Sequence, residues 1–131
     1  MPAERQGGCA CGRVRYSVAG EPLRVGLCHC TSCRQESGSA FTAYAVWPRS
    51  AFRSTGEFST WEGRSFCPVC GSRLFSLGDD EAEVKIGTLE EAPTTLTPTY
   101  ELWVWRREHW MKPLPEARPA VERALNIPAR S

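Results

Sequence analysis

Short runs of apolar residues separated by turn-forming residues dominate the chain. Residues 13–18 alternate polar and apolar side chains, as expected for a β-strand with one buried face. Similar runs end in Gly- or Pro-containing turns, and they occupy residues 23–27, 40–47, 52–54, 58–61, 64–66, 73–77, 83–86 and 100–105. The number and spacing of these runs predict a mainly β protein of antiparallel strands. Only residues 121–125, shortly after Pro119, predict a helical turn.

Length and charge set the class of protein. The 131 residues are enough for one domain, and we expect a single zinc-binding domain over residues 1–131. The 16 basic and 15 acidic residues give a net charge of +1 without a basic run, so no nucleic-acid or anionic-membrane partner is expected. No apolar stretch approaches the roughly 20 residues of a membrane span. Residues 1–8 lack the apolar segment of a secretory signal, so we expect a cytoplasmic protein.

The seven cysteines are the most unusual feature of the composition. An odd count leaves one thiol over in a disulfide framework, and the expected compartment keeps thiols reduced. The cysteines are also clustered, in Cys9-Ala10-Cys11, in the C-x-C-x-x-C run of residues 28–33, and in a C-x-x-C-G turn at residues 67–71. Clustered, unpaired thiols predict metal binding.

The C-x-x-C-G turn of Cys67, Cys70 and Gly71 is the most specific motif. Two sulfurs at this spacing can approach one zinc ion, and a glycine can adopt the positive φ with which the chain leaves such a turn. A redox C-x-x-C of the thioredoxin type would begin a helix in a βαβ unit, whereas strand-like sequence lies on both sides here. The motif therefore favours zinc.

A closed structural zinc site needs four ligands, so Cys67 and Cys70 need two more. If residues 9–11 form a strand, Cys9 and Cys11 point to the same face and can bind the same ion. The alternative partition pairs Cys67 and Cys70 with Cys28 and Cys33 and leaves three thiols over. We prefer a structural zinc on four residues, Cys9, Cys11, Cys67 and Cys70, which would close a long loop of the chain.

The remaining Cys28, Cys30 and Cys33 offer three thiolates. Three protein ligands plus an exchangeable position are typical of a reactive zinc site. An ion with thiolate ligands suits the binding of another thiolate, which indicates addition of a thiol to an electrophile or the reverse elimination. The alternative is a second structural site completed by His29 or by a partner chain. His29 would point away from the sulfurs in an extended segment, so we expect it to lie at the surface or to form a hydrogen bond beside the ligands instead.

The chain resembles the glutathione-dependent formaldehyde-activating enzyme family, which includes the centromere protein V group. The matching segments are GCACGRVRY at residues 8–16, CHCTSCR at 28–34, SGSAF at 37–41, RSFCPVCGS at 64–72 and GTL at 87–89. The resemblance implies a tent-like arrangement of small antiparallel sheets of the Mss4-like fold, cross-linked by zinc. It also implies two zinc ions per chain, one structural on Cys9, Cys11, Cys67 and Cys70 and one catalytic on Cys28, Cys30 and Cys33.

The activity implied by the resemblance is that of a carbon–sulfur lyase. The family's namesake reaction joins glutathione and formaldehyde to S-hydroxymethylglutathione, so the expected partner is a small, glutathione-like thiol. The alternatives are a non-catalytic zinc-binding interaction module, as the centromere group suggests, and a thiol or metal sensor. A homodimer is compatible with the sequence, which does not fix the oligomeric state.

Residues that follow the three-cysteine run are candidate substrate contacts. They are Arg34, Ser37, Gly38 and Ser39, which could reach a substrate carboxylate or amide. The alternative is that Ser37, Gly38 and Ser39 only form the turn into the next strand. The large aromatic residues of a small β domain are more often core than pocket, and we expect this of four tryptophans, Trp61, Trp103, Trp105 and Trp110.

Overall fold

The computed structural model describes residues 3–115, and the predicted helical turn at 121–125 lies outside them. The protein is mainly β, as predicted, with strands in two sheets. Its contacts divide it into two compact units, Met1–Arg24 with Ala45–Thr95 and Val25–Tyr44 with Leu96–Ser131. Among the described residues, no helix has the length and apolar character needed to cross a membrane. The prediction of one domain over residues 1–131 stays a prediction.

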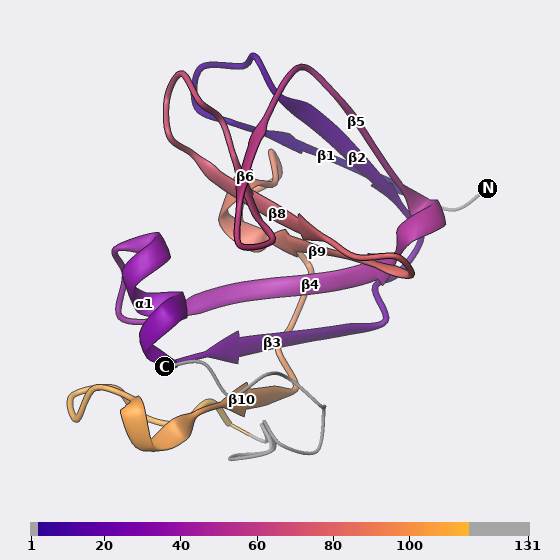
Figure 1. Ribbon diagram of the computed structural model, residues 1–131. Helices are drawn as coiled ribbons and strands as arrows, with labels where there is room; N and C mark the ends of the chain where they lie inside the picture. Colours follow the sequence, from indigo (N-terminus) through magenta and orange to yellow (C-terminus); the bar gives the residue numbers. More distant parts are fainter. Residues whose placement is uncertain (1–2, 116–131) are drawn as a thin grey trace. The chain divides into compact units, whose positions relative to one another are not determined.

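The first unit contains a three-stranded antiparallel sheet and an antiparallel meander (Figure 1). The sheet has the order β1 (Glu4–Gly8), β2 (Arg15–Ala19), β5 (Phe52–Thr55). The meander comprises β6 (Ser59–Trp61), β7 (Arg64–Phe66), β8 (Arg73–Leu77) and β9 (Glu81–Lys85). Two short 3-10 helices, η1 (Arg49–Ala51) and η2 (Ile86–Thr88), complete this unit.

The core of the first unit follows from the alternation read in the sequence. Tyr16 and Val18 of β2 are buried, and the other three residues of the strand are half-buried. The Tyr16 ring stacks on Phe52 at a centroid distance of 5.8 Å, and Phe52 meets Phe75 edge-on at 4.9 Å. These aromatic contacts join β2, β5 and β8, so the two turns that emerge from β1 and β7 rest on a packed core.

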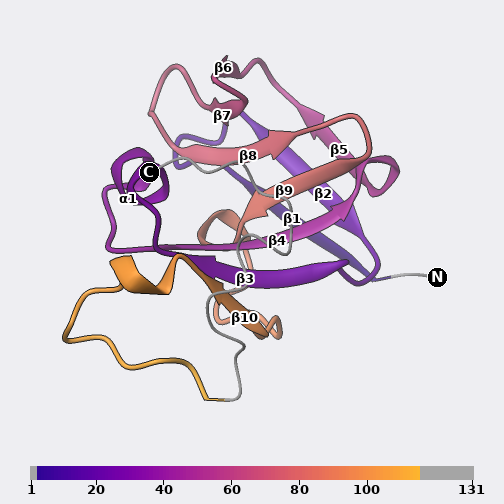
Figure 2. The same cartoon turned by 60° about the horizontal axis from the view of Figure 1, so that its bottom comes forward.

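The second unit contains strand β3 (Arg24–Cys28), helix α1 (Thr31–Ser37), strand β10 (Tyr100–Leu102) and the 3-10 helix η3 (Val104–Arg106). The first residue of β3, Arg24, still belongs to the first unit. Strand β4 (Thr42–Pro48) begins in this unit and ends in the first. Strands β10 and β3 pair in parallel, with Tyr100 opposite Gly26, and lie side by side in Figure 2. This parallel pair departs from the otherwise antiparallel pattern.

Two local expectations were wrong, and one helix was not predicted. Strand 100–105 ends at Leu102, because Trp103 has a φ of 57° that turns the chain into η3. Leu23 precedes β3 and is 55% exposed, so it does not share the buried face of Val25 and Leu27. Helix α1 was not predicted, because residues 31–37 are too few to show helical periodicity.

Gly26 allows β10 to pack closely on β3. A Cβ at Gly26 would lie 2.5 Å from Cζ and 2.9 Å from Oη of Tyr100. The Tyr100 hydroxyl is also fixed by a 2.7 Å hydrogen bond with the Tyr44 hydroxyl, and Tyr100 is 1% exposed. The ring therefore cannot move aside without breaking a buried hydrogen bond.

We predict that Gly26→Ala destabilises the protein by about 1–3 kcal/mol, since the added methyl overpacks a fixed ring. Urea denaturation of the metal-loaded protein measures the change. The control is Gly87→Ala, where a Cβ would meet no heavy atom within 4 Å. Equal midpoints for both variants would contradict the close packing of Tyr100 on Gly26.

Candidate metal centres

Four cysteine sulfurs of the first unit converge. The Sγ atoms of Cys9, Cys11, Cys67 and Cys70 all lie within 4.8 Å of one another. Cys11 Sγ lies 3.6 Å from Cys9 Sγ and 3.7 Å from Cys67 Sγ. Four sulfurs bound tetrahedrally at the zinc–sulfur bond length stand about 3.8 Å apart. The donor set therefore fits a closed four-thiolate zinc site, and these are the four residues expected from the sequence.

The N-terminal half of this cluster is a turn, which corrects the expected strand geometry. Strand β1 ends at Gly8, and the chain then reverses through Cys9 to Gly12. Gly12 N donates to Cys9 O at 3.1 Å, and Cys9 N donates to Val14 O at 3.0 Å. Cys9 and Cys11 therefore converge because the chain folds back, and not because a strand alternates its faces.

The other half is the C-x-x-C-G turn between β7 and β8. Gly71 N donates to Cys67 O at 2.8 Å, and the φ of Gly71 is 80°, as the motif predicts. The amides of Val69 and Cys70 lie 3.4 and 3.5 Å from Cys67 Sγ. These backbone donors act to lower the pKa of Cys67, but burial and the thiols of Cys70 and Cys11 raise that pKa overall.

Hydrogen bonds lower the pKa at two further ligands, Cys70 and Cys9. The Ser72 hydroxyl is the main cause that lowers the pKa of Cys70 to about 5. Burial acts to raise the pKa of Cys9, but the Val14 amide, 3.2 Å from its sulfur, and the neighbouring thiols lower it overall. Cys9 and Cys67 are buried, whereas Cys11 and Cys70 are exposed. The cluster therefore lies at the edge of the core and suits a cation.

The second cluster lies entirely in the other unit. The sulfurs of Cys28, Cys30 and Cys33 lie within 4.8 Å of one another, at the end of β3 and in the first turn of α1. Cys30 is the N-cap of α1, and its sulfur accepts a hydrogen bond from Cys33 N at 3.3 Å. Cys28 and Cys30 are buried, and Cys33 is half-buried.

Proton sharing explains how three thiols coexist in this cluster. Hydrogen bonds from Cys28 and Cys33 lower the pKa of Cys30 to about 2. The same bond to Cys30 raises the pKa of Cys28 far above that of an ordinary thiol. One sulfur therefore holds the negative charge while its neighbours keep protons, and a divalent cation would displace those protons. Among the described residues, the cluster holds three sulfurs and no fourth ligand, which fits an open zinc site.

His29 lies between two of these cysteines but belongs to a different interaction. Its side chain is fully buried, and Nε2 lies 2.8 Å from Oε1 of Glu101. The backbone amide of His29 donates to Leu102 O at 3.0 Å. The expected hydrogen-bonding role of His29 is therefore what the structure shows.

Glu101 is a functional candidate that the sequence analysis missed. It is 2% exposed and accepts hydrogen bonds from His29 and from Leu114 N, while Arg107 lies 3.4 Å away. Burial acts to raise its pKa, but the Leu114 amide, His29 and Arg107 together hold the pKa below its ordinary value. Glu101 thereby joins the three-cysteine segment to residues 107–114. The sequence signal that could have identified it is the position of this acidic residue inside the apolar run of residues 100–105.

The predicted substrate contacts all have structural partners. Ser37 Oγ donates to Cys33 O at 2.7 Å, and Gly38, with a φ of 71°, donates its amide to Arg34 O at 2.8 Å. Ser39 N donates to Ser37 Oγ at 3.1 Å. Ser37, Gly38 and Ser39 thus end helix α1, and a role in substrate binding stays a prediction for them and for Arg34.

The tryptophans divide between core and surface. Trp103 is buried, as expected, but Trp61, Trp105 and Trp110 are 64%, 52% and 72% exposed. The expectation that these three belong to the core was wrong. Trp105 and Trp110 follow the turn at Trp103, where the chain has left strand β10.

One of the comparisons with known proteins identifies a family. A profile described as "Glutathione-dependent formaldehyde-activating enzyme" matches residues 4–106. An uncharacterized lyase of Schizosaccharomyces pombe is 30% identical over 80 residues, which cover 57% of this chain and 58% of the yeast protein. The matched part thus spans less than two thirds of that relative. A crystal structure of a Rhodobacter sphaeroides protein matches with a TM-score of 0.52 and 23% identity, over 66% of this chain and 89% of that one, which supports the fold alone.

We predict that Glu101→Gln destabilises the protein by about 3 kcal/mol at pH 7, because it leaves Arg107 without its buried counter-ion. Glu81→Gln is the control, since its ion pair with Arg24 is only half-buried and its loss should cost about 1 kcal/mol. Because the folded-state pKa of Glu101 is lowered, its contribution is full above its unfolded pKa and is lost as pH falls through the folded pKa.

Chemical denaturation between pH 7 and pH 3 measures both effects. The stability gap between wild type and Glu101→Gln should narrow on acidification. A gap that is constant with pH, or as small as that of Glu81→Gln, would show that Glu101 is not an ionised buried partner.

Proposed function

The chain belongs to the family of glutathione-dependent formaldehyde-activating enzymes, and on this premise we propose that it is a zinc-dependent carbon–sulfur lyase. Its substrate would be a glutathione-type thiol adduct, such as S-hydroxymethylglutathione formed from glutathione and formaldehyde. The observation that supports this proposal most directly is the cluster of Cys28, Cys30 and Cys33, which offers three sulfurs and leaves a fourth position open. The lyase name of the yeast relative is consistent with the same reaction class.

The two cysteine clusters would have different roles. Cys9, Cys11, Cys67 and Cys70 would hold a structural zinc, and Cys28, Cys30 and Cys33 a catalytic one. A zinc ion bound at the second cluster would hold an incoming thiol as its thiolate at neutral pH. The N-cap position of Cys30 and the buried His29–Glu101 pair would keep these sulfurs in place, so that the exchangeable position stays open to the substrate.

The proposed reaction needs no oxidant or reductant. In the forward direction the thiolate sulfur forms a bond to the aldehyde carbon, and the electron pair of the C=O π bond moves to oxygen. The proton given up by the thiol ends on that oxygen, so the product carries an S–CH₂–OH group. In the lyase direction the hydroxyl loses its proton, the carbon–sulfur bond breaks, and the thiol regains the proton.

We expect glutathione to change the ligand field at the three-cysteine site only. In protein loaded with cobalt in place of zinc, glutathione should intensify the thiolate-to-cobalt charge-transfer absorption, because a fourth sulfur joins the ion. With ¹³C-formaldehyde, NMR exchange between free aldehyde and S-hydroxymethylglutathione should be faster in the presence of the zinc protein.

The matched controls are Cys33→Ser and Ser32→Ala, which change adjacent residues of the same helix turn. Cys33→Ser should abolish both responses, whereas Ser32→Ala should retain them. An unchanged cobalt spectrum at millimolar glutathione, together with no acceleration of exchange, would refute the proposed function.

A further inference from the structure

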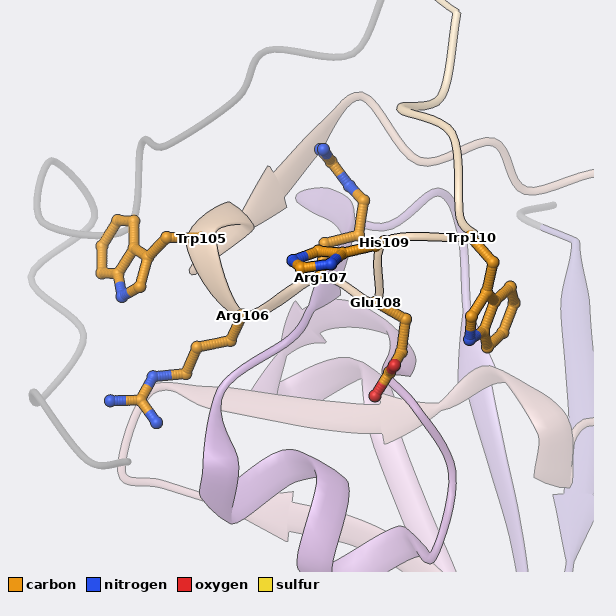
Figure 3. Close-up of a pocket in the computed structure, with 6 residues that line it drawn as sticks. All are labelled: Trp105, Arg106, Arg107, Glu108, His109 and Trp110. Atoms are coloured by element: carbon orange, nitrogen blue, oxygen red, sulfur yellow. The ribbon is translucent and has the colours of Figure 1, made fainter.

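The segment after strand β10 forms a surface that the proposed function does not yet use. Residues 104–111, which we call the η3 loop, line two open hollows of about 500 and 290 Å³. Figure 3 shows the residues that line the smaller hollow. In Figure 3, Trp105 and Trp110 point away from each other on opposite sides of the loop, and Glu108 points toward helix α1. The hollows therefore combine aromatic and charged side chains.

Hydrogen bonds and an ion pair connect the η3 loop to helix α1, which contains Cys33 and is capped by Cys30. Arg34, the residue after Cys33, donates from Nη1 to Arg106 O at 2.9 Å and forms an ion pair with Glu108. Arg106 in turn donates from Nη1 to Oγ1 of Thr31, the residue after Cys30, at 2.5 Å. Arg106 and Glu108 of the loop thus contact Thr31 and Arg34, which directly follow Cys30 and Cys33 in the sequence.

The loop has more positive charge than its own contacts neutralise. Glu108 pairs with Arg34, and Arg107 pairs with Glu101. Arg106 is exposed, and its guanidinium contacts only neutral groups in the described structure, the Thr31 hydroxyl and the Trp103 ring, whose centroid is 5.8 Å away. A guanidinium held by neutral partners remains able to bind a carboxylate through two parallel hydrogen bonds.

The exposed aromatic residues add a second feature of a binding surface. Trp110 is 72% exposed and Trp105 is 52% exposed, although the Trp105 ring contacts Trp103 at 4.8 Å. Tryptophan and arginine are the residue types enriched at the energetically dominant positions of binding sites. Here both types line the same hollow beside a site that would bind only the sulfur of a substrate.

We propose that the η3 loop binds the non-reacting part of the substrate and selects thiols that carry carboxylates remote from the sulfur. Arg106 pairs with a substrate carboxylate, and Trp110 covers the adjoining amide or methylene groups. This inference rests on the proposed function, because the sulfur itself is bound at the three-cysteine site. The substrate class is therefore an anionic thiol, and a neutral thiol of the same reactivity is bound less tightly.

Cobalt-loaded protein gives the test, with glutathione and the neutral thiol 2-mercaptoethanol as probes. We expect Arg106→Gln and Trp110→Ala each to weaken glutathione binding about tenfold and to leave 2-mercaptoethanol binding unchanged. The matched controls are Arg64→Gln and Trp61→Ala on the β6–β7 hairpin, where the guanidinium of Arg64 lies 5.6 Å from the ring centroid of the exposed Trp61. Both controls should bind glutathione as the wild type does.

The assignment would be overturned if the two variants bound both thiols equally more weakly, or bound both as tightly as the wild type does. It would also be overturned if the two control variants lost the same affinity for glutathione. A separate probe distinguishes this failure from failure of the proposed function. S-methylglutathione keeps both carboxylates but cannot form a thiolate, and its binding is followed through the indole N–H signals of Trp105 and Trp110 in NMR spectra. Shifts that disappear in Arg106→Gln support the loop assignment even if no thiol alters the cobalt spectrum, and absence of shifts in the wild type refutes it.

Discussion

The convergence of sulfur atoms from two turns is the constraint on which the first unit depends. Cys11 and Cys67 are 56 residues apart in the sequence, yet their sulfurs lie 3.7 Å apart. Thiolates at this distance repel one another unless a cation lies between them, and the Ser72 hydroxyl already favours the thiolate form of Cys70. A metal ion would therefore close a long loop of the chain, which a small domain with a limited core needs more than a large one does.

The three-cysteine site is built differently. Its sulfurs come from one short segment, so bringing them together closes no long loop, and their positions depend on the elements around them. Gly26 lets Tyr100 lie against β3, Cys30 caps α1, and Glu101 binds the side chain of His29 from β10. The four-sulfur site is thus suited to stability. A zinc ion on the three-sulfur site would keep one coordination position for an exchangeable ligand, and the neighbouring His29–Glu101 pair is buried.

Local sequence patterns predicted the parts of the structure that depend on local chemistry. Alternation identified β2, and the C-x-x-C-G motif identified the turn at Gly71 with its positive φ. The division of the cysteines into four and three followed from ligand number, and the structure brings together the same groups. The boundaries that failed depend on single dihedral angles or on long-range contacts. The left-handed turn at Trp103 ended a strand that hydrophobicity alone would continue to residue 105. Glu101 could not be assigned because its partners, His29 and Leu114, lie 72 and 13 residues away.

Two independent metal sites, one closed and one open, explain the placement of the seven cysteines. Cadmium-113 NMR of protein loaded with cadmium in place of zinc tests this division, because the chemical shift reports the number of sulfur ligands. We expect two resonances, one typical of four sulfurs and one of three, with Cys70→Ser altering only the first and Cys33→Ser only the second. A single resonance, or a change in both resonances caused by either substitution, would contradict it.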